Sequence, residues 1–137
     1  SFVNAQSIDI LRALVRNGIE LSVDDFLSGN ATFHNVSLYS DCIHYVKLDK
    51  GVVNDLANAH TLPDRGKSML GITEGMIATF HTKVGRLIRV IGEGIDSQNI
   101  VKLLKNIDVD LMQGFYLGRP EVAKSFVKRF IRKKHAK

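Results

Sequence analysis

Residues capable of chemistry recur along the chain at one kind of position, the end of a short apolar segment. They are Asp24 and Asp25, Lys47 and Asp49, Glu93, and Gln113. Carboxylate oxygens are the ligands that hard divalent cations prefer, and a neighbouring ammonium group can hold a water molecule or stabilise phosphoryl charge. Two such cations about 4 Å apart can clamp a phosphodiester and activate the water that attacks it. These residue types therefore indicate metal-dependent phosphate chemistry.

Each of these residues also has a structural explanation when it is taken alone. Asp24 and Asp25 can form a turn or cap a helix. Lys47 can simply face outward from a strand, and Glu93, between two glycines, can lie in a loop. The joint pattern favours a site, because the carboxyl ends of parallel strands meet at one edge of a sheet. We therefore expect these side chains to surround a common cavity.

Apolar periodicity divides the chain into alternating helices and strands that would position these residues. Helical spacing and Gly or Pro punctuation predict helices near residues 7–15, 32–38, 52–59, 63–83, 97–107 and from 121 onward. Short β-branched segments predict strands at 19–23, 42–49, 87–91 and 109–112. Such alternation is typical of the α/β class with a parallel sheet, as in doubly wound sheets and (β/α)8 barrels. Four units amount to about half of a (β/α)8 (TIM-like) barrel, which usually needs roughly 250 residues.

Composition and motifs exclude several other classes of protein. Hydrophobic residues make up 45% of the chain and charged residues 24%, which is typical of a globular protein. Cys42 is the one cysteine, so we expect no internal disulfide framework and a reducing, cytoplasmic location. The five histidines lack paired metal-ligand spacing, which argues against a zinc site. No apolar run approaches the roughly 20 residues of a membrane span.

The positive charge of the chain is concentrated near its end. The net charge is +5, and residues 118–137 hold eight Lys or Arg against one Glu, so the remainder is slightly acidic. A basic tail of this kind can contact nucleic acid or anionic lipid. We favour the simpler interpretation of a solvated terminal helix whose Phe126, Phe130 and Ile131 pack inward. Nothing beyond charge indicates a base-reading surface, so nucleic acid is not an expected partner.

Four segments together resemble the motifs of one bacterial signalling family, the EAL domain. That family has the forms DDFG, KID, AEGVE and QGYYFGRP. They are similar, in order and approximate spacing, to VDDF at 23–26, VKLD at 46–49, GEGID at 92–96 and QGFYLGRP at 113–120. The last motif is the most specific, and the ordered set is stronger than any single member. By this resemblance, residues 1–120 are the C-terminal half of an EAL-like domain and residues 121–137 are its terminal basic helix.

The resemblance implies a fold, a reaction and a set of roles. EAL domains are (β/α)8-like barrels that hydrolyse cyclic di-GMP to linear pGpG with two Mg²⁺ or Mn²⁺ ions. On this basis Asp24, Asp25 and Glu93 belong to the metal site. Lys47 and Glu93 are the catalytic residues, with Lys47 positioning the attacking water, and Gln113 binds substrate near the phosphate. The implied protein is a cytoplasmic cyclic di-GMP phosphodiesterase, a hydrolase.

Several features depart from the family pattern. Leu27 replaces the glycine of DDFG, and the family loop GTGYSS corresponds to LSGNAT at 27–32. In the segment that corresponds to AEGVE, Gly92 replaces the alanine and Asp96 replaces the second glutamate. The EAL signature itself would lie before Ser1, so we expect no turnover from this chain alone. Either the chain is a piece of a longer protein or two halves associate, which makes the N-terminal half or a second copy a partner. The alternative function is a degenerate EAL protein that binds cyclic di-GMP or a protein partner without catalysis.

Overall fold

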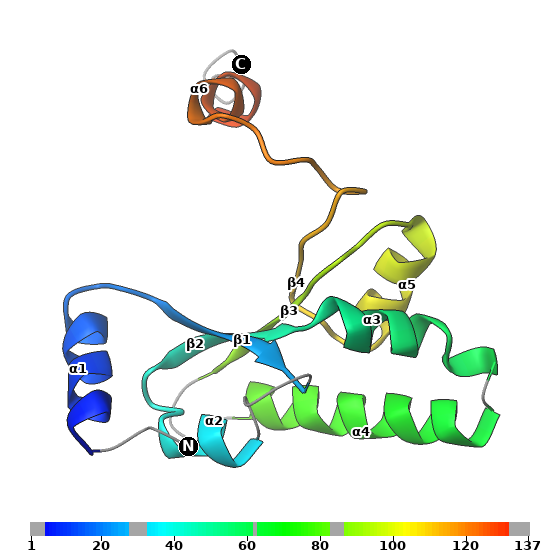
Figure 1. The fold of residues 1–137 in the computed structure, drawn as a ribbon, viewed down its shortest axis with the longest axis horizontal. Coiled ribbons are helices and arrows are strands. Elements are labelled where there is room, and N and C mark those ends of the chain that lie inside the picture. Colours follow the sequence, from blue (N-terminus) through cyan, green and yellow to red (C-terminus); the bar gives the residue numbers. More distant parts are fainter. Residues whose placement is uncertain (1–4, 28–32, 62, 83–86, 132–137) are drawn as a thin grey trace.

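The computed structural model describes residues 5–27, 33–61, 63–82 and 87–131, in which helices and strands alternate (Figure 1). The helices are α1 (Ala5–Arg16), α2 (Phe33–Leu38), α3 (Lys50–Ala57), α4 (Pro63–His81), α5 (Gln98–Asn106) and α6 (Ala123–Phe126). The strands are β1 (Leu21–Phe26), β2 (Ile43–Leu48), β3 (Arg89–Gly92) and β4 (Leu111–Met112). A 3₁₀ turn, η1 (Ala59–Thr61), follows α3, and a π-helical turn, η2 (Val127–Ile131), continues α6.

The four strands form one parallel sheet in the order β1-β2-β3-β4. At least one helix joins each strand to the next, as parallel neighbours require. The predicted α/β class with a parallel sheet is therefore confirmed. Parts of the predicted elements lie outside the described residues, namely the loop at 28–32, the end of the helix at 83 and the tail beyond 131. No helix within the described ranges is long and apolar enough to cross a membrane.

One face of the sheet is buried under helices, and the other is open. Val46, Leu48 and Val90 point into the buried side and are at most 1% exposed. The helices contribute Val53, Leu56, Ile77, Phe80 and Leu104 to the same core. Figure 1 shows α3 between α5 and α4. Because side chains alternate along a strand, Tyr45 and Lys47 of β2 lie on the opposite side, which we call the open face.

The first strand continues further than its sequence predicts. Asp24 and Asp25 were expected to end the strand, but β1 runs on to Phe26. Val23 and Phe26 pair with the β2 residues on either side of Lys47, so two residues of β1 face one residue of β2. This irregularity is a β-bulge, and Asp25 takes a φ of 52° there, which aspartate tolerates better than most residues. The two aspartates therefore lie inside the strand, opposite a lysine.

The last strand is shorter than predicted because its first residues finish the preceding helix. Asp108 has a φ of 59°, and the Val109 N–H donates a hydrogen bond to the Leu104 carbonyl at 3.0 Å. Residues 108 and 109 are therefore part of the turn that closes α5. Pairing with β3 begins only at Leu111.

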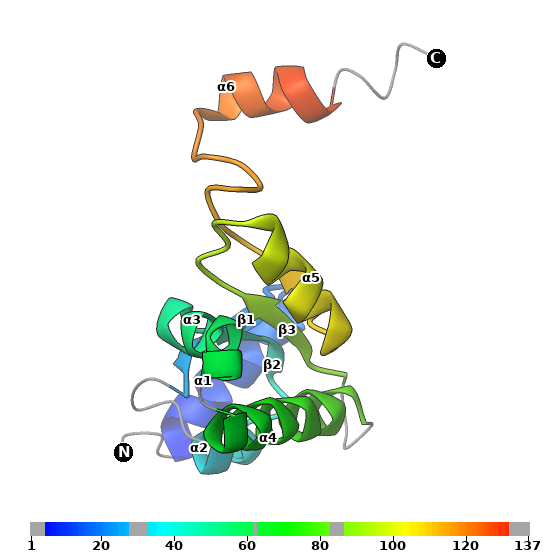
Figure 2. The same cartoon turned by 90° about the vertical axis from the view of Figure 1, so that its right-hand side faces the viewer.

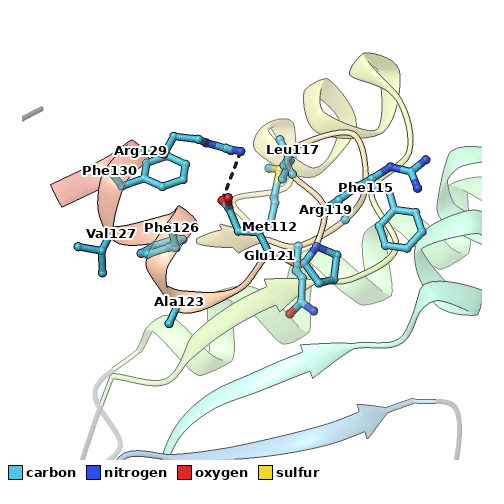
Figure 3. Close-up of a pocket in the computed structure, with 14 residues that line it drawn as sticks. Met112, Phe115, Leu117, Arg119, Glu121, Ala123, Phe126, Val127, Arg129 and Phe130 are labelled. Atoms are coloured by element: carbon cyan, nitrogen blue, oxygen red, sulfur yellow. Dashed lines mark ion pairs between the residues drawn. The ribbon is translucent and has the colours of Figure 1, made fainter. Parts of the chain in front are cut away.

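The C-terminal helix stands apart from the sheet in both views of the fold (Figures 1 and 2). The expectation that Phe126, Phe130 and Ile131 pack inward is wrong, because these side chains are 48%, 48% and 50% exposed. The two phenyl rings instead contact each other, with centroids 4.8 Å apart. A hollow of about 630 Å³ separates this helix from the segment after β4, and an ion pair of 3.3 Å joins Arg129 to Glu121 across it (Figure 3).

Candidate active site

Three charged side chains meet on the open face at the carboxyl end of the sheet. The ammonium group of Lys47 lies 3.0 Å from Asp24 Oδ1 and 2.5 Å from Glu93 Oε1. The side chains of Lys47 and Glu93 are only 21% and 19% exposed, whereas that of Asp24 is 64% exposed. We call these three residues the Lys47 cluster. It joins β1, β2 and the segment after β3 in the place where the sequence predicts a site.

Backbone geometry explains how these three residues come together. Lys47 pairs in register with Ile91 of β3, so its long side chain reaches Glu93, two residues further on. The Glu93 N–H donates to the Leu48 carbonyl at 3.1 Å, which fixes this residue beside β2. On the other side, the bulge presents Asp24 to the lysine. The Asp25 N–H donates to the Asp24 carboxylate at 3.1 Å, so both aspartates belong to one structural unit.

The charges of the cluster stabilise one another. The pKa of Lys47 is raised, chiefly by its hydrogen bond to Glu93 and also by the one to Asp24, and these outweigh the opposing effect of burial. The pKa of Asp24 is lowered, chiefly by its hydrogen bond from Lys47. Lys47 therefore stays protonated at neutral pH. It can donate hydrogen bonds and offset negative charge, but it cannot serve as a base.

Gln113 lies near the cluster, in the wall of a second hollow. The backbone N–H of Gln113 donates to the Gly92 carbonyl at 2.9 Å, and the backbone carbonyl of Gln113 accepts from the Ile95 N–H at 3.1 Å. These bonds tie the segment after β4 to the segment after β3. Gln113 and Glu93 both line the hollow between these segments, whose volume is about 340 Å³. The structure thus brings four of the predicted strand ends to one rim.

Asp49, which also follows a strand, has a structural role. Its side chain accepts a hydrogen bond of 2.7 Å from the Gly51 N–H and caps α3. Because of this cap, α3 begins at Lys50, two residues earlier than predicted. Lys50 therefore enters the wall of the second hollow, a position that the predicted helix starting near residue 52 does not reveal. The signal available in the sequence is a lysine directly after VKLD.

The cluster supplies suitable donor atoms for a hard divalent cation, but not a whole coordination shell. Asp24 and Glu93 present carboxylate oxygens, and Asp25 adjoins them in the bulge. Over the described part of the chain, no three carboxylate, histidine or cysteine side chains come together closely enough to hold a metal ion. Mg²⁺ commonly uses one or two protein carboxylates and completes its shell with water and substrate phosphate. The donor chemistry therefore fits, and further ligands are needed.

Comparison with protein families identifies the fold that carries this rim. The family model of the EAL domain matches residues 2–120. The chain belongs to the EAL domain family. EAL domains have a TIM-barrel fold, and the four-stranded parallel sheet of this chain matches part of it: an EAL domain protein from Listeria monocytogenes EGD-e superposes with a TM-score of 0.75 at 23% identity, covering 96% of this chain and 49% of that one. The predicted fold class, a parallel α/β sheet that forms part of a (β/α)8 barrel, is thus confirmed.

Curated EAL proteins are similar over most of the chain. The signaling protein YkoW of Bacillus subtilis is 30% identical over 111 residues, which is 81% of this chain and 12% of YkoW. The bifunctional diguanylate cyclase/cyclic di-GMP phosphodiesterase MucR of Pseudomonas aeruginosa is 28% identical over 123 residues, 88% of this chain and 16% of MucR. The chain therefore spans less than a fifth of these relatives.

A further solved EAL structure concerns the metal. The manganese/cyclic di-GMP complex of Klebsiella pneumoniae BlrP1 has a TM-score of 0.65 at 23% identity, with 85% of this chain and 26% of that chain covered. The EAL family is metal-dependent, and a divalent ion is consistent with the carboxylate donors of the rim.

Proposed function

We propose that this EAL chain carries part of the active site of a cyclic di-GMP phosphodiesterase that produces linear pGpG. The main support for this proposal is the pair of ion pairs that Lys47 forms with Asp24 and Glu93. They bring opposite charges from three strand ends together at the catalytic rim of the fold. The likeness to MucR, named as a cyclic di-GMP phosphodiesterase, supports this assignment. The activity belongs in the cytoplasm, where the free, buried Cys42 would stay reduced.

Each residue of the rim takes a defined role in this proposal. Asp24, Asp25 and Glu93 would hold Mg²⁺ or Mn²⁺, which when bound would supply a more acidic water and positive charge at the phosphate. Lys47, protonated at neutral pH, orients the attacking water and offsets charge on the phosphoryl oxygens. Gln113 donates its amide N–H to the phosphate. The water oxygen bonds to phosphorus, one ester P–O bond breaks, and the proton that the water gives up passes through solvent to the released ribose oxygen.

We also propose a division of the chain that follows these roles. Residues 1–120 form the EAL part that carries the rim, and residues 121–137 form a terminal basic helix of the same domain. The match of the family model to residues 2–120 supports this division.

A second candidate function is non-catalytic binding of cyclic di-GMP or a protein partner. The observation that favours it is Leu27, directly after the bulge, which takes a φ of 71° where the family motif has glycine. A leucine in this region is strained, so the residue directly after the bulge departs from the family's sequence pattern next to the site.

Turnover and binding assays distinguish the two candidates. The purified chain is incubated with cyclic di-GMP and Mg²⁺ or Mn²⁺, while chromatography follows pGpG and calorimetry follows binding. Binding that Glu93→Gln weakens supports the proposed site. Turnover that the same substitution abolishes makes this chain an enzyme by itself, whereas binding without turnover favours the binding module. If cyclic di-GMP neither binds nor reacts, the proposal is wrong.

A further inference from the structure

The helical segment that follows the last strand combines exposed apolar side chains with exposed basic ones. We use the name tail helix for residues 123–131, the continuous run of α6 and η2. We propose that the tail helix docks on the surface of a lipid bilayer that carries anionic headgroups. Its apolar side chains enter the interfacial region, and its basic side chains contact the headgroups. This interaction goes beyond the proposed phosphodiesterase function and does not depend on it.

The apolar side chains of the tail helix lie together on one side and are open to water. Phe126 and Phe130 are four residues apart, with ring centroids 4.8 Å apart, and Val127 and Ile131 repeat the same spacing. All four residues are between 40% and 50% exposed. Figures 1 and 2 show that the helix stands clear of the sheet, so the described core does not cover this side. An exposed group of large apolar side chains marks an interaction surface.

A second wall extends this apolar surface. The hollow of about 630 Å³ beside the tail helix is also lined by Met112, Phe115 and Leu117 from the segment at the end of the sheet (Figure 3). Phe115 and Leu117 are 66% and 46% exposed. A flexible acyl chain can fill a hollow between two such walls. This filling would add to the apolar area that a bilayer removes from water.

Basic side chains occupy the rest of the tail helix. Lys124 and Lys128 are exposed, and within the ranges that the structure describes neither forms an ion pair. Arg129 pairs with Glu121 at 3.3 Å. Residues 118–137 hold eight Lys or Arg against one Glu, so this end of the chain is complementary in charge to an anionic surface. Each Lys or Arg near such a bilayer strengthens binding by about fivefold.

The combination of the two kinds of side chain favours a bilayer over other partners. Nucleic acid would use the positive charge but would leave the phenyl rings and Ile131 in water. A symmetric pair of tail helices would bury the apolar side but would bring two strongly positive segments together. Phe on one side of a helix and Lys or Arg on the other are typical of helices that lie on a membrane surface. The family model ends at residue 120, so the tail helix lies beyond the match to the EAL domain.

The test measures co-sedimentation of the full chain with vesicles of phosphatidylcholine alone or mixed with anionic phosphatidylglycerol. We expect binding to the anionic vesicles to be at least about tenfold tighter, and to weaken as salt is added. Phe126→Ser combined with Phe130→Ser should weaken it at least about tenfold, because two phenyl rings no longer leave water. Ile72→Ser is the matched apolar control on α4, where Ile72 is 64% exposed, and should have no effect.

Charge variants test the contribution of the basic side chains. Lys124→Gln combined with Lys128→Gln should weaken binding to the anionic vesicles by about 25-fold, a factor of about five for each residue. The control removes an equal charge from α5, by Lys102→Gln combined with Lys105→Gln, both of which are exposed lysines. That variant should weaken binding less than about threefold, because charges away from the contact are screened.

Fluorescence reports whether the apolar side enters the bilayer. The chain has no tryptophan, so Phe130→Trp introduces a single probe, and Ile72→Trp places the same probe on α4 as a control. Anionic vesicles should move the emission of the Phe130→Trp variant to shorter wavelength and leave that of the Ile72→Trp variant unchanged.

Three results would overturn the proposal. The first is no vesicle binding, or equal binding to neutral and anionic vesicles. The second is binding that the double serine variant retains, or emission of the Phe130→Trp variant that does not shift. The third is an alternative partner in place of vesicles: a DNA duplex bound equally by the double serine variant would assign the charge to nucleic acid, and self-association lost in that variant would assign the apolar side to a second copy.

Discussion

Two polar clusters lie on the open face of the sheet, one at each end of the strands. The Lys47 cluster is at the carboxyl end. At the amino end, Tyr45 donates a hydrogen bond to Glu20 at 2.8 Å and accepts one from Arg89 at 3.0 Å. The Arg89 guanidinium also lies over the Tyr45 ring, 4.9 Å from its centroid. We call these residues, Glu20, Tyr45 and Arg89, the Tyr45 cluster.

The difference between the clusters lies in what surrounds them. The Tyr45 hydroxyl donates one hydrogen bond and accepts another within the cluster, so its hydrogen-bonding capacity is used by the protein itself. The Lys47 cluster is built around a bulge and adjoins a hollow through Glu93. The Tyr45 cluster therefore has a structural role at the amino end of the strands, whereas the Lys47 cluster, with a similar number of charged groups, faces a cavity at the carboxyl end. This matches the general division of (β/α)8 folds, in which the carboxyl ends of strands carry chemistry.

The largest expected contrast is in ligand affinity. In the proposed site, Lys47→Ala removes the cation that would oppose the charge of the phosphate and leaves two carboxylates without it. Cyclic di-GMP should bind about 10- to 100-fold more weakly, as expected for loss of hydrogen bonds to a charged group. Arg89→Ala removes an equal charge from the Tyr45 cluster and should change affinity less than twofold. Calorimetry of both variants measures this, and equal losses would contradict the division of roles.

Gly114→Ala should disrupt the packing between the segments after β3 and β4 and leave the Tyr45 cluster unchanged. The added methyl group would overlap backbone atoms of Ile95, which cannot rotate away. We expect the free energy of unfolding to fall by about 1–3 kcal/mol, or more, in urea denaturation. Gly71→Ala is the control, because no atom lies within 4 Å of the new Cβ in the middle of α4. That variant should be neutral or slightly stabilising, and a loss equal to that of Gly114→Ala would show that the rim packing is looser than described.

A smaller effect concerns the strain next to the bulge. Leu27→Gly restores the residue of the family motif at a φ of 71° and should raise the free energy of unfolding by about 0.5–1 kcal/mol. Asp108→Gly, at a φ of 59°, should gain less, because aspartate tolerates this conformation. Thermal and urea unfolding measure both. A loss of stability in Leu27→Gly would mean that the leucine side chain contributes more than its backbone costs.

The smallest expected effect is in acid. The pKa of Asp24 lies below its ordinary value of 3.8 because Lys47 donates to it, so the unfolded chain takes up this proton at a higher pH than the folded chain. The contribution to stability is full above about pH 4 and is lost as the pH falls through the folded pKa. Lys47→Met should therefore flatten the decline of melting temperature below pH 4, measured by circular dichroism. An unchanged acid profile would show that the exposed Asp24 gains nothing measurable from this pair.

Sequence periodicity was sufficient to predict the position of those helices and strands that a local apolar pattern marks. The strand around Val46, flanked by apolar alternation, lies where it is predicted, and so does the helix that begins at Pro63. Lys47 and Glu93 could be named as partners because parallel strands bring their ends together. Their ion pair follows from register, which a single strand does not encode.

Other features depend on information that no local pattern carries. The bulge at Asp24 and Asp25 depends on pairing with β2, so VDDF read alone suggests a strand end. The inward packing of Phe126 and Phe130 needs an apolar surface to receive them, and periodicity only shows that an apolar stripe exists. Lys50 enters the hollow because Asp49 caps α3 and Gly94 lets the lysine stem pass. Each of these outcomes is decided by tertiary contacts.

The most direct measurement is an NMR titration of the full chain with cyclic di-GMP, carried out once with Mg²⁺ and once without it. Chemical-shift changes are followed for each residue. We expect shifts at Asp24, Lys47, Glu93 and Gln113, with none at Arg89. Shifts centred on the Tyr45 cluster, or no shifts at any ligand concentration, would contradict the claim that the carboxyl-end rim binds the nucleotide.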